Sequence, residues 1–94
     1  MKYVYQRAKH DEAIIREYKE RLSKDSLDAL VEKYNREARC GIGGVHRQAL
    51  YLIALRKEFL ERLEQSPIAI EDRKIIDLSA EIDIVDGELV RKIT

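Results

Sequence analysis

The chain has 94 residues, of which 45% are hydrophobic and 38% are charged, and this balance favours one folded domain over residues 1–94 rather than a disordered segment. Lysine plus arginine number 18 and aspartate plus glutamate number 18, so the sequence lacks the basic excess that is typical of a dedicated nucleic-acid binder. Because the formal net charge is zero, electrostatic repulsion between copies of the chain opposes self-association only weakly.

Cysteine content and hydropathy indicate the setting in which the protein works. Cys40 is the only cysteine, so no disulfide can form within the chain, and we expect a reducing, cytoplasmic setting. Residues 1–7 contain no apolar stretch of signal-peptide length. The apolar run of residues 50–55 has six residues, whereas a membrane-spanning helix needs roughly 20. We therefore expect no membrane insertion.

The first helix is predicted over residues 11–22, where apolar residues recur at helical spacing. Asp11 and Glu12 suit its first turn, because acidic side chains interact favourably with the positive N-terminal end of a helix. Residues 2–6 are open to two interpretations. They extend the same apolar stripe upstream as helix, or they alternate as a short strand.

A second helix is predicted over residues 27–39, whose apolar residues form one stripe. Asp25 or Ser26 can cap its start by accepting a hydrogen bond from a free backbone N–H. Gly41 suits the position just after its end, since glycine readily adopts the left-handed conformation that closes a helix.

The third helix, predicted over residues 45–65, is the most informative element of the chain. Its middle, residues 50–55, is apolar on every side, whereas a surface helix has one apolar stripe. We therefore expect a central helix that is covered by other elements of the chain, by a second copy or by a partner. The Ser66-Pro67 pair ends this helix, because proline disfavours a helical residue before it.

The hydrophobic period changes in the last quarter of the chain. Apolar and polar residues alternate over residues 75–85, which is typical of a half-buried strand. Asp86-Gly87 favours a two-residue type I′ turn, so residues 88–93 are predicted to return as an antiparallel strand. Three cross-strand pairs define the expected register: Ile84 with Leu89, Ala80 with Ile93, and Glu81 with Lys92.

Residues 68–73 are ambiguous. They form a short strand that leads into a turn at Glu71-Asp72-Arg73, or a helical turn starts at Glu71. An isolated hairpin is only marginally stable in water, so the C-terminal hairpin must lie on the helices, gain a third strand or pair with another chain. The sequence therefore predicts an α+β fold, with three helices followed by an antiparallel hairpin.

The glycine-rich segment before the third helix is the first candidate site. Gly41, Gly43 and Gly44 can expose backbone N–H groups to an anion at the helix N-terminus, and His46 and Arg47 can add hydrogen bonds and charge. The segment lacks the Lys-Ser/Thr pair of a phosphate-binding loop, and it follows a helix where that motif requires a strand. We favour an ordinary interhelical turn that needs positive φ angles.

The two helices within residues 27–55 also suggest a helix-turn-helix. In that arrangement Arg47, Gln48 and Tyr51 lie near the start of the second helix, where base-contacting residues are found. The five-residue turn with three glycines is loose, however, and the second helix is strongly apolar just after its first turn. Nucleic-acid recognition is therefore an alternative to a simple helical hairpin.

Motifs for catalysis or metal binding are weak. Cys40 and His46 lie close in sequence and suggest a thiolate–imidazole pair, but Cys40 is better explained as a small apolar residue at a helix end. The histidine, cysteine and carboxylate spacing does not define a metal site. We predict a non-enzymatic protein with no catalytic residues, no metal and no cofactor.

The excess apolar surface of the third helix predicts an interface formed by Leu50, Tyr51 and Leu55, with packing inside one chain as the alternative. Strand pairing at Ile68 or Ile93 offers a second route to a dimer. The sequence thus predicts a small binding domain that forms a homo-oligomer or binds a protein partner. Nucleic-acid binding is the first alternative, and binding of a small anion by the glycine-rich segment is the second.

Overall fold

The structure, a computed structural model, describes residues 2–6, 8–43 and 45–92, and within them it has three helices and five strands. The helices are α1 (Asp11–Leu22), α2 (Leu27–Cys40) and α3 (His46–Leu63). The strands are β1 (Lys2–Val4), β2 (Ile68–Glu71), β3 (Ile75–Leu78), β4 (Ile82–Val85) and β5 (Glu88–Arg91). The predicted α+β class, with three helices followed by antiparallel strands, is confirmed.

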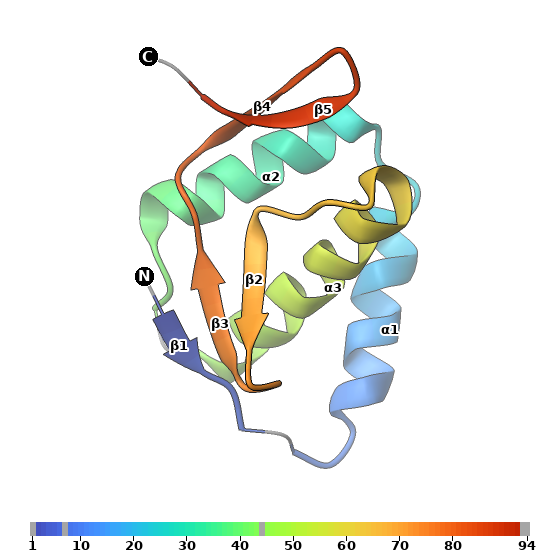
Figure 1. Ribbon diagram of the computed structural model, residues 1–94. Helices are drawn as coiled ribbons and strands as arrows, with labels where there is room; N and C mark the ends of the chain where they lie inside the picture. The colour runs from blue at the N-terminus through green and yellow to red at the C-terminus, as the bar shows by residue number, and fades with distance from the viewer. Residues whose placement is uncertain (1, 7, 44, 93–94) are drawn as a thin grey trace.

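The strands form two separate antiparallel sheets (Figure 1). The first sheet has the order β1-β3-β2, and its register places Tyr3, Ile76 and Ile70 side by side in one cross-strand row. The second sheet is the hairpin of β4 and β5, which lies along α2. Both segments that the sequence left open, at residues 2–6 and 68–73, therefore contain a strand of the first sheet.

The alternating stretch of residues 75–85 is interrupted after β3, and β4 belongs to the other sheet. Contacts with α2 hold the chain where it crosses between the sheets. The Tyr34 hydroxyl donates to the carbonyl of Ser79 at 2.8 Å. The side chain of Asn35 accepts from the Ile82 N–H at 2.8 Å and donates to the Ile82 carbonyl at 2.9 Å. Because the alternation continues through the interruption, the sequence predicts one long strand where the structure has two short ones.

The turn between β4 and β5 is the predicted one. Asp86 and Gly87 have φ angles of 52° and 77°, and a type I′ turn requires positive φ at both central residues. Ile84 lies opposite Leu89, which confirms the predicted register.

The ladder of the hairpin continues one residue beyond its strands. The backbone N–H of Lys92 donates to the carbonyl of Glu81 at 2.9 Å, and Lys92 Nζ lies 4.0 Å from Glu81 Oε1. The predicted pairing of Glu81 with Lys92 is therefore confirmed. The predicted pair of Ala80 with Ile93 falls outside the described residues, because Ile93 is not among them.

Helix α3 lies at the centre of the fold, with α1 on one side and β2 on the other (Figure 1). Its middle is buried all round, as the sequence predicted, and the covering elements belong to the same chain. Burying one large aliphatic side chain contributes about 1.5–3 kcal/mol, so the buried side chains of this helix contribute substantially to stability. Among the helices that the structure describes, none combines the length and apolar character needed to cross a membrane.

The boundaries of α3 differ slightly from the prediction. The helix begins at His46 and ends at Leu63, two residues before the predicted end. Glu64 adopts a left-handed conformation with φ 60°, and its N–H donates to the Leu60 carbonyl at 2.9 Å. This closing turn, rather than Pro67, ends the helix.

Candidate functional site

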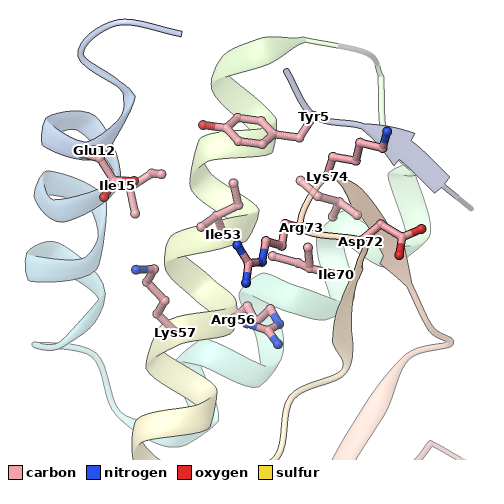
Figure 2. Close-up of a pocket in the computed structure, with 11 residues that line it drawn as sticks. Tyr5, Glu12, Ile15, Ile53, Arg56, Lys57, Ile70, Asp72, Arg73 and Lys74 are labelled. Carbon is pink, nitrogen blue, oxygen red and sulfur yellow. The ribbon is translucent and has the colours of Figure 1, made fainter. Parts of the chain in front are cut away.

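A cleft of about 710 Å³ lies between α1, α3 and the turn that joins β2 to β3 (Figure 2). Its apolar lining comes from α1, α3, β2 and β3: Ile15, Ile53, Ile70 and Ile76. The ring of Tyr5, just after β1, lies at one end of the cleft. The volume is within the range of pockets that hold small ligands, and the isoleucine lining is typical of them.

Cationic side chains surround this apolar lining. They come from α3 and from the turn after β2: Arg56, Lys57, Arg73 and Lys74. Glu12 also lines the cleft, whereas the carboxylate of Asp72 points away from the Arg73 guanidinium (Figure 2). None of the ion pairs found among the described residues includes any of the four cations. The cleft therefore has a local excess of positive charge, although the chain as a whole is neutral.

Arg56 is one of two arginines at this cleft. It follows Ile53 by one helical turn, so both side chains lie on the same side of α3. Its Nε atom is buried and, within the part of the chain that the structure describes, has no hydrogen-bond partner. Native structures pair almost all such donors, because a buried donor without an acceptor costs about 1–3 kcal/mol. Arg56 therefore keeps an unsatisfied donor beside the cleft that it lines.

Arg73 is the second arginine and lies in an unfavourable backbone conformation. Its φ angle is 62° and that of Asp72 is 50°, so both central residues of the turn are left-handed. Glycine is the usual second residue of such a turn, and a non-glycine residue there costs about 1–2 kcal/mol. The turn directs the guanidinium of Arg73 into the cleft, between Ile53 and Ile70 (Figure 2). A strained backbone conformation that places a charged side chain in a cleft is typical of a residue that contacts a ligand.

A buried carboxylate fixes the end of the cleft where Tyr5 lies. Asp11 is 2% exposed and accepts hydrogen bonds from the Tyr5 hydroxyl at 2.7 Å and from the Ala8 N–H at 2.6 Å. Its other oxygen lies 2.9 Å from His46 Nε2, and the rings of Tyr5 and His46 stack with centroids 5.6 Å apart. Burial raises the pKa of Asp11, but the hydrogen bonds from Tyr5, His46 and Ala8 outweigh it and lower the pKa to about 2. Asp11 is therefore an anion near neutral pH, and His46 Nε2 is the donor.

The glycine loop before α3 is hydrogen-bonded to the side chain of Gln48. The Gly43 N–H donates to Gln48 Oε1 at 2.8 Å. The amide nitrogen of Gln48 donates to the Gly41 carbonyl and to Glu37 Oε2, each at 3.1 Å. One of the N–H groups that we expected to face an anion is therefore already bonded. Gly44, another residue of that predicted site, lies outside the described residues.

The side chains predicted to assist this loop contact other partners. His46 is bonded to Asp11, and Arg47 Nη1 lies 3.5 Å from the Tyr18 hydroxyl. The structure thus does not bring Gly43, His46 and Arg47 together around one position.

The three residues predicted to form an interface lie in different environments. Leu50 and Leu55 are 1% and 0% exposed and belong to the core of the chain. Tyr51 is half-buried and meets the ring of Tyr18 edge to face, with centroids 5.5 Å apart. Burial also raises the pKa of the Tyr51 hydroxyl. Of the three, Tyr51 is the one that retains surface for contact with another molecule.

Metal binding and comparisons with known proteins add no site. Across residues 2–6, 8–43 and 45–92, no group of three or more His, Cys, Asp or Glu side chains is arranged to hold a metal ion. The chain matches no protein-family model, no curated protein and no solved structure. The geometry of the cleft is therefore the basis for the function proposed below.

The cleft is not evident from the sequence because its lining is assembled from distant segments. Two local signals were present. Arg56 and Lys57 directly follow the apolar middle of α3, and Asp72-Arg73 sits at a possible turn with a cation where glycine is preferred. Neither signal indicates by itself that the two segments face the same space.

Proposed function

We propose that the protein is a small, non-enzymatic binding domain whose cleft takes a ligand with an acidic group and an apolar body. One observation supports this proposal above all: Arg56 and Arg73 face an isoleucine-lined cleft, and neither takes part in an ion pair among the described residues. The apolar lining favours a ligand body that leaves water, and the arginines favour an acceptor with negative charge.

The two parts of the ligand contribute comparable free energies. Each buried methylene contributes about 0.8 kcal/mol, and a hydrogen bond to a charged group contributes about 1.5–3 kcal/mol. A short acid without an apolar chain should therefore bind poorly, and so should an apolar chain that ends in a cation. Octanoate, acetate and octyltrimethylammonium separate these requirements.

The test is a titration of the full chain with these three probes, followed by the methyl NMR signals of Ile53 and Ile70. Octanoate is expected to shift both signals saturably, while acetate and octyltrimethylammonium shift them far less. Arg56→Met should weaken octanoate binding about ten-fold, because it removes a charge-assisted hydrogen bond. Lys24→Met, on the exposed connection between α1 and α2, removes a charge away from the cleft and should leave binding unchanged.

Two results would overturn the proposal. One is equal binding of octanoate and octyltrimethylammonium, which would mean that the cations of the cleft do not select charge. The other is unchanged octanoate affinity in an Arg56→Met protein whose circular dichroism shows a native fold.

Self-association and a protein partner stay predictions, as does the cytoplasmic setting. Tyr51, which lines a shallow surface site together with Arg47, retains surface for such contact. Sedimentation equilibrium between about 1 and 100 µM at two salt concentrations would decide, because a dimer population depends on protomer concentration. A dimer insensitive to salt would support self-association, and a monomer throughout would contradict it.

Nucleic-acid binding through Arg47, Gln48 and Tyr51 has weaker support, since the Gln48 amide is bonded within its own chain. An affinity for DNA that falls steeply with salt and drops on Arg47→Ala would support it.

A further inference from the structure

Strand β2 is an open edge of the first sheet and lies beside the cleft. The order β1-β3-β2 gives β2 one neighbouring strand within the described residues. Ile70, in the middle of β2, lines the cleft together with Ile15 of α1 and Ile53 of α3. The unpaired edge of the sheet and the cationic cleft therefore meet at Ile70.

The hydrogen bonds around β2 show which of its backbone groups face the open edge. In an antiparallel ladder, residues alternate between bonding the neighbouring strand and pointing away from it. The Pro67 carbonyl accepts from the Ser79 N–H at 3.3 Å, so Pro67 belongs to the set that faces the β3 side. Ile68 belongs to the other set, and its N–H donates to Ser66 Oγ at 3.0 Å. By the same alternation, Ile70 directs its N–H and carbonyl toward the open edge.

We propose that the ligand of the cleft is an acidic peptide segment in extended conformation, which adds to β2 as a further strand. This inference rests on the proposed function and names its ligand class. The peptide residue opposite Ile70 would exchange two backbone hydrogen bonds with it, and its side chain would point into the cleft. Backbone bonds supply affinity in this mode of recognition, and alternate side chains supply specificity.

Charge decides which peptide fits. Side chains two residues before and after the one opposite Ile70 share its face of the strand, about 7 Å away along the chain. At that spacing, we expect glutamate side chains to lie near Arg56 of α3 and Arg73 of the turn after β2, both of which line the cleft. A peptide with lysine at these positions would instead meet four cations with Glu12 as the main opposing charge. Acidic residues flanking an apolar one are therefore the expected pattern.

The probe is the fluorescein-labelled hexapeptide Thr-Glu-Thr-Ile-Thr-Glu, in which the isoleucine is meant to lie opposite Ile70. Binding to the full chain is measured by fluorescence anisotropy. One control peptide carries lysine in place of glutamate. A second control is methylated on the isoleucine amide nitrogen, which removes the N–H that would donate to Ile70. The acidic peptide is expected to bind saturably, and each control should bind about ten-fold more weakly or worse.

A pair of protein variants tests the edge itself. Ile70→Pro removes the N–H that faces the open edge, and proline is tolerated at an edge position whose N–H makes no ladder bond. Ile70→Val keeps that N–H and is the matched control. Because Ile70 also lines the cleft, the two variants are compared with each other: Ile70→Pro should lose peptide binding, whereas Ile70→Val should retain it.

The outcomes separate the two proposals. If octanoate binds but the acidic peptide does not, or if the methylated peptide binds as well as its parent, the inference is overturned and the proposed function stands. If neither octanoate nor the peptide binds, the proposed function fails as well. Should Ile70→Pro not fold, the comparison of the parent and methylated peptides decides with the unaltered protein.

Discussion

His46 Nε2 lies 2.9 Å from Asp11 Oδ1, and this contact joins the start of α3 to the start of α1. The other oxygen of the same carboxylate accepts from the Tyr5 hydroxyl, so one buried side chain connects both helices to the segment after β1. Because Tyr5 lies at one end of the cleft, Asp11 also fixes part of the wall of the proposed binding site.

The acid stability of the protein should depend on Asp11. Although burial raises its pKa, hydrogen bonds from Tyr5, His46 and Ala8 lower it from 3.8 to about 2. A depressed folded-state pKa gives stability that is complete above about pH 4 and is lost as pH falls toward 2. Asp11→Asn should therefore lower the melting temperature near neutral pH and flatten its fall between about pH 4 and 2.

Thermal unfolding followed by circular dichroism measures this effect across the pH range. Glu32→Gln, exposed on α2 beyond its first turn, is the control and should keep the slope of the unaltered protein. If Asp11→Asn loses stability in acid as steeply as the unaltered protein, protonation of Asp11 is not the cause of that loss.

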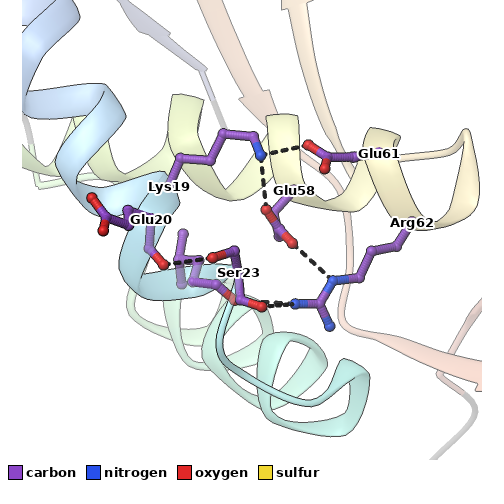
Figure 3. A network of polar contacts seen from close by, with 7 residues as sticks. Lys19, Glu20, Ser23, Glu58, Glu61 and Arg62 are labelled. Carbon is purple, nitrogen blue, oxygen red and sulfur yellow. Dashed lines mark hydrogen bonds and ion pairs between the residues drawn. The ribbon is translucent and has the colours of Figure 1, made fainter.

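The buried side chain of Glu58 is the centre of an ionic network between α1 and α3 (Figure 3). Its side chain is 4% exposed and lies 3.1 Å from Lys19 Nζ and 2.9 Å from Arg62 Nε. Glu58→Ala would leave both cations without this partner, and since both are partly exposed we expect a loss of about 2 kcal/mol. Glu17→Ala breaks the exposed pair with Arg21 and should cost less than about 0.5 kcal/mol. Equal losses in urea denaturation would contradict the assigned role of Glu58.

Asn35 should determine how firmly the β4–β5 hairpin is held on α2. Its amide bonds both backbone groups of Ile82 in a buried position, so Asn35→Ala leaves the N–H and the carbonyl of Ile82 without this partner. We expect a loss of about 2–3 kcal/mol and faster hydrogen exchange in β4. Glu32→Ala, exposed on the same helix, should change stability by less than about 0.5 kcal/mol. Unchanged exchange in β4 would show that other contacts hold the hairpin.

Local features of the fold could be predicted because their causes lie within a few residues. Asp86-Gly87 specifies its own turn, and Ser26 caps α2 by accepting from the Ala29 N–H three residues later. The interruption between β3 and β4 could not be predicted in this way. Tyr34 and Asn35, which hold it, lie more than forty residues earlier in the chain.

The candidate site was harder to predict than the fold for a related reason. The glycine loop attracted attention because its composition is unusual, yet the Gln48 side chain that bonds Gly43 could not be inferred from composition. The cleft has ordinary isoleucines and arginines, and only the packing of α1 and β2 on opposite sides of α3 brings them together. Sequence patterns report periodicity and turns, whereas the convergence of Arg56 and Arg73 is a tertiary property.

Arg73→Gly should make the protein more stable and a poorer binder. Glycine adopts the φ of 62° without strain, so the turn should gain about 1 kcal/mol, even after the higher backbone entropy of unfolded glycine is considered. The same change removes a guanidinium from the cleft and should weaken octanoate binding about ten-fold. Urea denaturation and the octanoate titration measure the two effects in one variant.

Arg73→Lys is the control, because it keeps a side chain at this left-handed backbone position and also keeps the charge. It should therefore show neither the gain in stability nor a comparable loss of binding. A stabilised Arg73→Gly protein that binds octanoate normally would show that the strained residue serves no ligand.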